Sequence, residues 1–182
     1  NTAIVDIEAG SGVWWRYKLV KETDVSPLVG TWQVASEAGS LAVGPSQGSS
    51  EWWSIDATGV TQRACYFDDT YVFGADGSFS NVLGSDTWLE AWQGTADACG
   101  TPVAPHNGSN PATYVHNQAA GTVTVTGDGA FIGLPKAHNG GEDGNPVNDT
   151  ITYIIDFVDT NTAIVDIEAG SGVWWRYKLV KN

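Results

Sequence analysis

The chain has 182 residues, the length of one ordinary domain, and its 8 Lys and Arg against 21 Asp and Glu give a net charge of −13. A chain this acidic lacks the basic face that nucleic acids and anionic membrane surfaces attract, so we expect neither as a partner. It has no apolar stretch of about 18 residues, so we expect no membrane-spanning helix.

A long exact repeat dominates the sequence. Residues 1–21 recur letter for letter as residues 161–181, at an offset of 160 residues. Two origins are open, a natural tandem array or an engineered duplication, and we favour the array because repeat proteins copy whole modules. Residues 1–21 are then the duplicated C-terminal hairpin of a preceding repeat, and residues 22–182 form a single β-domain. We expect this chain, which starts without Met, to begin within a longer protein.

The repeated segment reads as a β-hairpin. Residues 162–168 and 173–180 alternate between apolar and polar side chains on either side of a Gly-Ser-Gly turn at 170–172. Alternation places one set of side chains inward: Ala163, Val165, Ile167, Val173, Trp175, Tyr177 and Leu179. On the outer face, Asp166 and Glu168 oppose Arg176 and Lys178, and such cross-strand charges favour one register. We therefore predict that hairpin 161–181 completes the domain.

Further strands are predicted at 31–35, 71–73, 78–83, 122–126 and 150–158, the second and third joined by an Asp-Gly turn. No sustained 3.6-residue apolar period is present, so we expect few and short helices. Long stretches rich in Gly, Ser and Asn at 36–50, 94–112 and 135–149 are predicted loops. The predicted fold class is all-β, an antiparallel β-barrel or β-sandwich with little helix.

Three segments carry a resemblance to a known family. They are Leu28 to Trp32 (LVGTW), Tyr71 to Phe79 (YVFGADGSF) and Trp175 to Leu179 (WRYKL). Together they resemble the lipocalin-like β-domains of secreted bacterial proteins, over residues 27–181. The resemblance implies a meander of strands closed into a barrel with an open mouth, and a small apolar ligand as one candidate partner.

Tryptophan is the strongest compositional signal, with nine residues. Flat aromatic faces beside polar groups stack on sugar rings, whereas core packing is the alternative reading for any single Trp. Alternation places Trp15 and Trp175 in the core, and Trp14 on the outer face of its hairpin. The candidate glycan-binding residues are Trp52, Trp53, Trp88, Trp92 and Trp174.

Two cysteines, Cys65 and Cys99, form either one disulfide or two buried thiols. We favour the disulfide, which places the protein outside the cytosol, secreted or on the cell surface. The loop 141–149 gathers four oxygen-bearing side chains: Glu142, Asp143, Asn145 and Asp149. Calcium is the one candidate cofactor for it, although EF-hand spacing is absent and a solvated acidic loop is the favoured reading.

Enzymatic chemistry finds little support in the acidic residues. Asp166 and Glu168 alternate along one strand as glycosidase acids do, but the position of a first acid holds Ile164. Basic residues on the opposing strand offer both acids partners in ion pairs. We therefore expect the protein not to be an enzyme.

The second copy of the hairpin suggests a function. A barrel or sandwich uses one closing hairpin, so the copy at 1–21 exposes Trp14, Trp15, Tyr17 and Leu19 for assembly. The predicted function is a non-catalytic, structural or adhesive module of an extracellular tandem-repeat surface or fibre protein. Its expected partners are copies of itself or adjacent repeats, and polysaccharide. The alternatives are a lipocalin-like carrier of a small apolar ligand and a carbohydrate-active enzyme.

Overall fold

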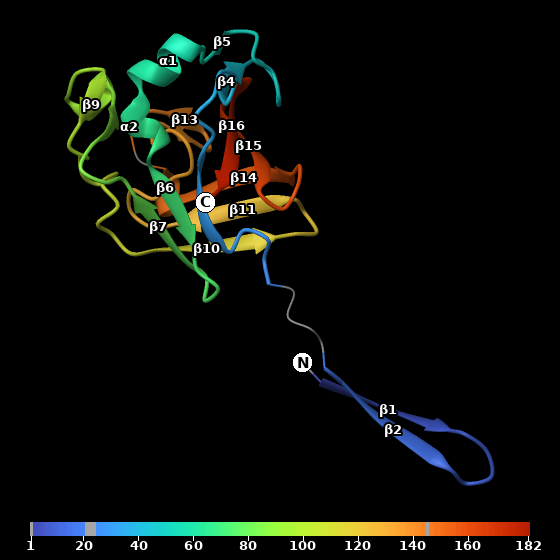
Figure 1. Ribbon diagram of the computed structural model, residues 1–182. Coiled ribbons are helices and arrows are strands. Elements are labelled where there is room, and N and C mark those ends of the chain that lie inside the picture. The colour runs from blue at the N-terminus through green and yellow to red at the C-terminus, as the bar shows by residue number, and fades with distance from the viewer. Residues whose placement is uncertain (1, 21–24, 145) are drawn as a thin grey trace.

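Eight antiparallel strands close into a barrel in the computed structural model, which describes residues 2–20, 25–144 and 146–182 (Figure 1). The predicted all-β class is confirmed, and of its two alternatives the barrel is the one observed. The barrel strands, in chain order, are β3 (Gly30–Val34), β6 (Thr70–Phe73), β7 (Ser78–Val82), β10 (Ala112–Asn117), β11 (Thr122–Thr126), β14 (Thr150–Phe157), β15 (Thr162–Gly170) and β16 (Val173–Lys181).

The barrel strands follow an up-and-down order. Each strand pairs with the next barrel strand in the chain, and β16 closes the barrel by pairing back with β3. The end of β16 at 179–181 pairs with β3, whereas its earlier part at 174–177 pairs with β4 (Leu41–Gly44). β4 in turn pairs with β5 (Trp53–Ser54). The prediction that 36–50 is a loop was therefore wrong in part, because this range contains β4. β3 covers only the end of β16, which leaves residues 174–177 of β16 open for pairing with β4.

The remaining elements are short. They are α1 (Ala57–Gln62), α2 (Ala64–Phe67), β8 (Thr87–Leu89), β9 (Ala98–Gly100), β12 (Ala137–His138), β13 (Gly141–Glu142), and the 3₁₀ turns η1 (Ala91–Gln93) and η2 (Val147–Asp149). The carboxylate of Asp56 accepts a hydrogen bond from the Gly59 amide and so caps α1. The expectation of few, short helices is confirmed. None of the described helices has the length and apolarity to cross a membrane.

Alternate side chains of the barrel strands point inward and are buried. The inward set of β15 and β16 is the predicted one, with Val165, Tyr177 and Leu179 fully buried. Trp32 of the LVGTW segment is also fully buried, and its indole nitrogen donates a 2.7 Å hydrogen bond to the Leu28 carbonyl. Large aromatic rings therefore fill much of the interior.

A chain segment that follows β11 and includes β12 enters the barrel. Its apolar residues are buried: Ala130, Phe131, Ile132, Leu134 and Ala137. Barrel side chains satisfy its backbone, because the hydroxyls of Tyr71 and Tyr153 accept hydrogen bonds from the amides of Gly133 and Ile132 at 3.0 and 2.9 Å. The amide of Asn81 donates to the Phe131 carbonyl at 2.8 Å. We call residues 129–138 the plug segment, since it occupies space that an open barrel leaves for a ligand.

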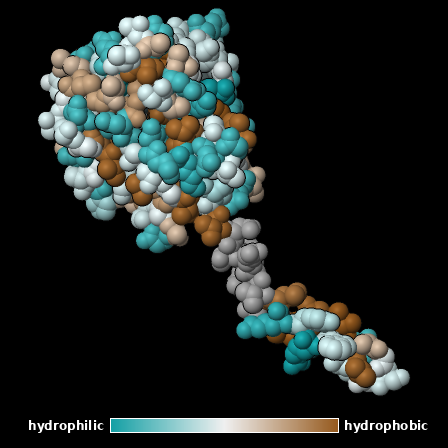
Figure 2. Space-filling model, in the orientation of Figure 1, coloured by the Kyte–Doolittle hydropathy of each residue, from teal (hydrophilic) through white to brown (hydrophobic). Residues whose placement is uncertain are grey.

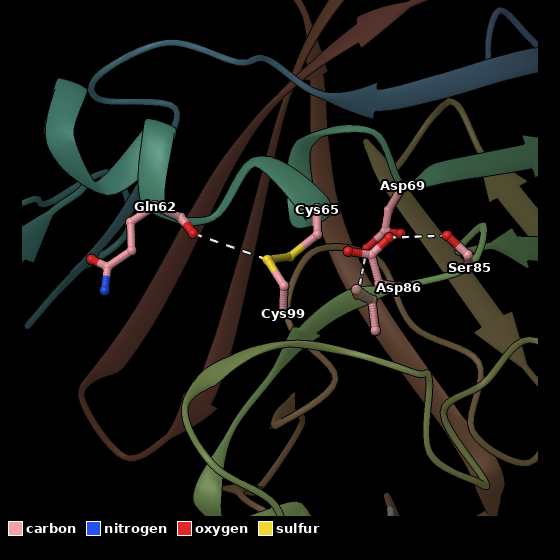
Figure 3. The surroundings of a disulfide bond; sticks show 7 residues. Gln62, Cys65, Asp69, Ser85, Asp86 and Cys99 are labelled. Atoms are coloured by element: carbon pink, nitrogen blue, oxygen red, sulfur yellow. Dashed lines mark hydrogen bonds between the residues drawn. A yellow bond between two sulfur atoms is a disulfide. The ribbon is translucent and has the colours of Figure 1, made fainter.

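The predicted disulfide is confirmed. Cys65 of α2 and Cys99 of β9 are bonded, and their Cα atoms lie 5.9 Å apart (Figure 3). The bond ties the loop that follows β7 to the helical segment before β6. The disulfide closes a 34-residue separation, so it restrains the segment before β6 and the segment after β7, which form few strand pairings of their own.

The two copies of the repeat form the same hairpin in different surroundings. β1 (Thr2–Glu8) pairs with β2 (Trp14–Val20) in the register of β15 and β16, so that Val5 opposes Tyr17 as Val165 opposes Tyr177. Among the described residues, no hydrogen bond or ion pair joins β1 or β2 to the barrel. In Figure 1 this hairpin stands apart from the barrel.

One prediction about the charges on the hairpin was only half right. Arg176 binds Asp166 at 2.7 Å as expected. Lys178 instead opposes Ile164 and pairs with Glu37 at 2.6 Å, while Glu168 opposes Trp174. Glu168 opposes Trp174, four positions from Lys178 along β16, so the two charged side chains are not neighbours. Glu37 lies beside β16 because the backbone of Ala35 and Ser40 is hydrogen-bonded to that of Lys178.

Candidate functional site

The N-terminal hairpin exposes an apolar face that its twin buries. Trp15, Tyr17 and Leu19 are 58%, 47% and 53% exposed, whereas their counterparts Trp175, Tyr177 and Leu179 are 7%, 0% and 0% exposed. Val5 and Ile7 lie on the same face, and Figure 2 shows hydrophobic residues along this hairpin. The expectation that the first copy exposes Trp14, Trp15, Tyr17 and Leu19 is confirmed, whereas the placement of Trp15 in a core by alternation alone was wrong, because the first hairpin has no barrel around it. Trp14 is exposed on the opposite face.

The twin hairpin occupies a defined position, which we call the closing slot. β14 borders it on one side through residues 154–157, paired with 163–166. On the other side, β4 pairs with 174–177 and β3 pairs with 179–181. The plug segment lies beneath it, since a Cβ atom built on Gly133 would overlap the Tyr177 ring. The slot therefore recognises the hairpin by both edges and by its apolar face.

The candidate glycan-binding tryptophans do not form one platform. Trp52 and Trp53 are 54% and 38% exposed, whereas Trp88 is only 7% exposed. Trp92 and Trp174 are half-buried. Burial of Trp88 follows from its place on β8, which packs against α2, and the Arg63 guanidinium carbon lies 4.4 Å from the centre of its ring.

Trp53 borders a groove at the end of the barrel where β5 and α1 lie (Figure 1). The groove holds about 300 Å³ and is lined by Trp53, Ser54, Asp56, Thr58, Gly59, Gln62 and Arg63. Arg63 also approaches the Trp53 ring, with 5.5 Å between the guanidinium carbon and the ring centre. Among the described residues, no carboxylate lies within ion-pair distance of Arg63. Its donors therefore remain available to a ligand.

A charged cluster that the sequence did not predict surrounds Trp175. The Lys136 ammonium lies 4.9 Å from the centre of the Trp175 ring and 3.0 Å from a carboxylate oxygen of Glu90. The Trp175 indole donates to Glu142 at 2.6 Å, and that of Trp92 donates to Glu90 at 3.1 Å. Four separate segments supply these residues, and local patterns do not reveal such contacts. The one feature of the sequence that pointed to this cluster is that Lys136 and Arg63 are the only Lys or Arg residues between 22 and 160.

The acidic loop 141–149 has other partners. Glu142 accepts the Trp175 hydrogen bond, and the Asp143 carbonyl is 3.1 Å from a ring nitrogen of His138. Asp149 follows in η2, and Asn145 lies outside the described residues. Within the described ranges, the one group of three clustered ligand side chains is Asp86 with Cys65 and Cys99, whose sulfurs are bonded to each other. The calcium prediction thus gains no geometric support.

A buried acid near the disulfide has an altered ionisation. The pKa of Asp69 is raised from 3.8 to about 8, chiefly by burial and to a smaller extent by the negative charges of Asp68 and Asp86, while a 2.6 Å hydrogen bond from Thr87 opposes the rise. Figure 3 shows Asp69 and Asp86 close to the Cys65–Cys99 bond. Asp69 therefore keeps its proton to a higher pH than an exposed carboxyl group does, and the hydrogen bond that it accepts from Thr87 links the end of α2 to β8.

Asp166 and Glu168, the acids considered for glycosidase chemistry, both accept hydrogen bonds from groups of the protein. Asp166 binds Arg176 through two hydrogen bonds of 2.7 and 2.8 Å and accepts a third from Gln47 at 3.2 Å. Glu168 lies on the solvent side of β15, and its carboxylate accepts a hydrogen bond from the Gly172 amide in the turn. Both acids therefore support the hairpin.

Comparisons with known proteins give this chain no family. No family model matches it, and a search of curated proteins found no match. Any functional conclusion therefore rests on the hairpins, the closing slot and the groove.

Proposed function

We propose that this protein is a non-catalytic, structural and adhesive module of an extracellular tandem-repeat surface or fibre protein, whose copies associate through their closing hairpins. The observation that carries the proposal is the second hairpin. It has the sequence, the register and the apolar face of the hairpin that closes the barrel. An apolar face of this size is normally covered by a partner. The disulfide supports a location outside the cytosol.

The number of hairpins explains why a repeat is the natural setting. This chain has two closing hairpins and one closing slot. In a tandem array, the extra hairpin closes an adjacent barrel, so every apolar face is covered. Identical copies then gain length and avidity without any new type of contact.

Association of the purified chain tests this proposal. Light scattering over a range of concentrations is expected to show assembly through the N-terminal hairpin, since Trp15 and Leu19 are exposed. Trp15→Glu combined with Leu19→Glu should abolish it. Trp52→Glu is the matched control, because Trp52 is equally exposed on the barrel. A chain that stays monomeric at every concentration contradicts the proposal.

A second candidate function, saccharide binding, is favoured by the groove beside Trp53. An exposed indole provides a stacking face, while Asp56, Gln62 and Arg63 provide hydrogen-bonding groups of both kinds. The groove contains a carboxylate and the chain carries a net charge of −13, so anionic sugars are repelled. We therefore propose neutral oligosaccharides as the ligand class.

Titration with neutral hexasaccharides, cellohexaose and mannohexaose, tests the groove. Trp53→Ala and Arg63→Ala are each expected to weaken binding about tenfold, through loss of the stacking face or of its support. Trp14→Ala, an exposed Trp of the first hairpin, should leave binding unchanged. Stronger binding of an oligogalacturonate, or no binding of any hexasaccharide, contradicts this candidate.

The two alternatives are less well supported. A carrier of a small apolar ligand requires interior space, and the plug segment occupies the barrel with Phe131, Ile132 and Leu134. An enzyme of glycan chemistry requires a pair of free acids, and Asp166 is bound to Arg176.

A further inference from the structure

We propose that the closing slot accepts either hairpin of the same chain, so that residues 1–21 can close the barrel in place of residues 161–181. This inference rests on the proposed function and adds to it the partner of the first hairpin, which is the chain's own barrel. The chain then contains two overlapping sets of eight strands, one within 1–160 and the other within 22–182. Both share the six barrel strands β3, β6, β7, β10, β11 and β14.

Every strand pairing that holds the second hairpin falls within the repeated residues. β14 pairs with residues 163–166, β4 pairs with 174–177 and β3 pairs with 179–181. In the first hairpin the same positions are 3–6, 14–17 and 19–21, with identical side chains. The first hairpin already has the internal register that the slot requires, so entry needs no rearrangement of its strands.

The first hairpin already contains the ion pair that the second hairpin forms on its outer face. Arg16 binds Asp6 through hydrogen bonds of 2.7 and 2.9 Å, as Arg176 binds Asp166 through bonds of 2.7 and 2.8 Å. In the slot, Gln47 donates a further hydrogen bond to Asp166. Asp6 would meet the same Gln47 amide, so the charged pair enters the slot already neutralised.

The chain between the first hairpin and β3 is long enough for this exchange. Lys181 opposes Trp32, and its ammonium donates a hydrogen bond to the Pro27 carbonyl at 3.1 Å. If Lys21 took the place of Lys181, the backbone of residue 21 would be separated from the Pro27 carbonyl by the length of a lysine side chain plus one hydrogen bond. The five residues 22–26 reach about 16 Å when extended, which covers this gap. β2 would then precede β3 as an ordinary antiparallel neighbour.

The two closed forms are expected to have similar stability. Their slot contacts are the same, and they differ in the connection that each hairpin uses. Residues 158–161 join β14 to the second hairpin, whereas residues 22–29 join the first hairpin to β3. Doubling the length of a connection changes the equilibrium by a factor of about three. Both forms should therefore be populated, and the excluded hairpin is free to meet another copy.

Engineered disulfides test which hairpin occupies the slot. Ile164 opposes Asp156 across the β14–β15 pair, on the outer face of the barrel, and Ile4 is its counterpart in the first hairpin. The full chain carrying Ile4→Cys and Asp156→Cys is oxidised, and peptide mapping then identifies the bond. Ile164→Cys with Asp156→Cys is the matched control, because those two positions are paired in the structure. Peptide mapping also verifies that Cys65 and Cys99 remain bonded to each other.

The inference predicts an intramolecular bond between the introduced thiols in both variants, with monomeric mass and a yield within about tenfold of each other. A bond in the control alone overturns the inference, and so does a bond that appears only in dimers. Neither result contradicts the proposed module function, which the association test addresses separately. Hydrogen exchange of β3 in each variant, compared with the unaltered chain, verifies that the barrel is folded.

Discussion

The hairpins β1–β2 and β15–β16 have the same 21 residues and the same internal pairing but opposite environments. Tyr17 is half exposed where Tyr177 is fully buried. The comparison separates two levels of structure: alternation, the glycine turn and the Asp–Arg pair determine the hairpin, whereas the barrel determines its burial. Because burying one large apolar side chain stabilises a fold by about 1.5–3 kcal/mol, the exposed hairpin gains most from entering a slot.

The largest effect is expected at the floor of the slot. Gly133 has a φ of +81°, and a Cβ atom there would overlap the Tyr177 ring. Gly133→Ala should lower the free energy of unfolding by about 3 kcal/mol, from the clash together with backbone strain. Gly140→Ala is the control, because its φ of +94° is similar and its Cβ would meet no atom. Equal losses in urea unfolding would show that the ring does not pack on Gly133.

The disulfide gives a reference that is independent of the hairpins. Replacing Cys65 and Cys99 by Ala removes the closure of a 34-residue separation and should cost about 3 kcal/mol. Both hairpins lie outside this loop, so the cost should be the same with and without Trp15→Glu in the first hairpin. Urea unfolding of the four chains measures this. A cost that depends on the first hairpin would mean that the hairpin contacts the loop.

The two ion pairs provide the most direct contrast between the hairpins. Arg176→Met leaves Asp166, which is 3% exposed, without its cation and should cost about 2 kcal/mol, a value reduced because Arg176 is one-third exposed. The measurement uses a chain with Val5→Asp, which keeps the first hairpin out of the slot. Arg16→Met in the same chain should not change the unfolding midpoint, since that pair is exposed. Similar losses of stability for Arg176→Met and Arg16→Met would contradict the different environments of the two ion pairs.

Asp69 gives the stability a pH dependence, and its slope per pH unit is the smallest of the changes predicted for these variants. Burial raises its pKa to about 8 in the folded barrel, whereas the unfolded chain releases the proton near pH 4. The free energy of unfolding should therefore fall between pH 4 and 8, by at most about 1.4 kcal/mol per pH unit. Asp69→Asn should flatten this profile, whichever hairpin closes the barrel. Urea unfolding of the unaltered chain and of Asp69→Asn at pH 5, 6, 7 and 8 measures this. If the free energies of unfolding of the two chains change with pH in parallel, Asp69 is not the group responsible.

Local patterns predicted the strands well and their surroundings poorly. Alternation identified the inward side chains of β15 and β16, and the Asp-Gly turn identified the β6–β7 hairpin. Alternation also placed Trp15 in a core, because it cannot distinguish a hairpin with a slot from one without. The loop at 36–50 hides β4, whose four residues are too few to show a period.

The candidate site was predictable only in part. The repeat indicated the hairpins directly, since identity is visible without any structure. The Trp53 groove depends on Arg63 lying between two tryptophans that are 35 residues apart in sequence, and no local signal reports such a contact. Trp88 was a candidate for sugar binding by composition, and its burial follows from the packing of β8 on α2.

Thermal unfolding of the full chain with Val165→Asp tests most directly whether the two hairpins are interchangeable. Val165 is fully buried, so a charge there prevents the second hairpin from closing the barrel. We predict that this variant stays folded, closed by residues 1–21, and that adding Val5→Asp unfolds it. Val5→Asp alone should have little effect, because Val5 is exposed. If Val165→Asp alone unfolds the chain as completely as the double variant does, the hairpins are not interchangeable.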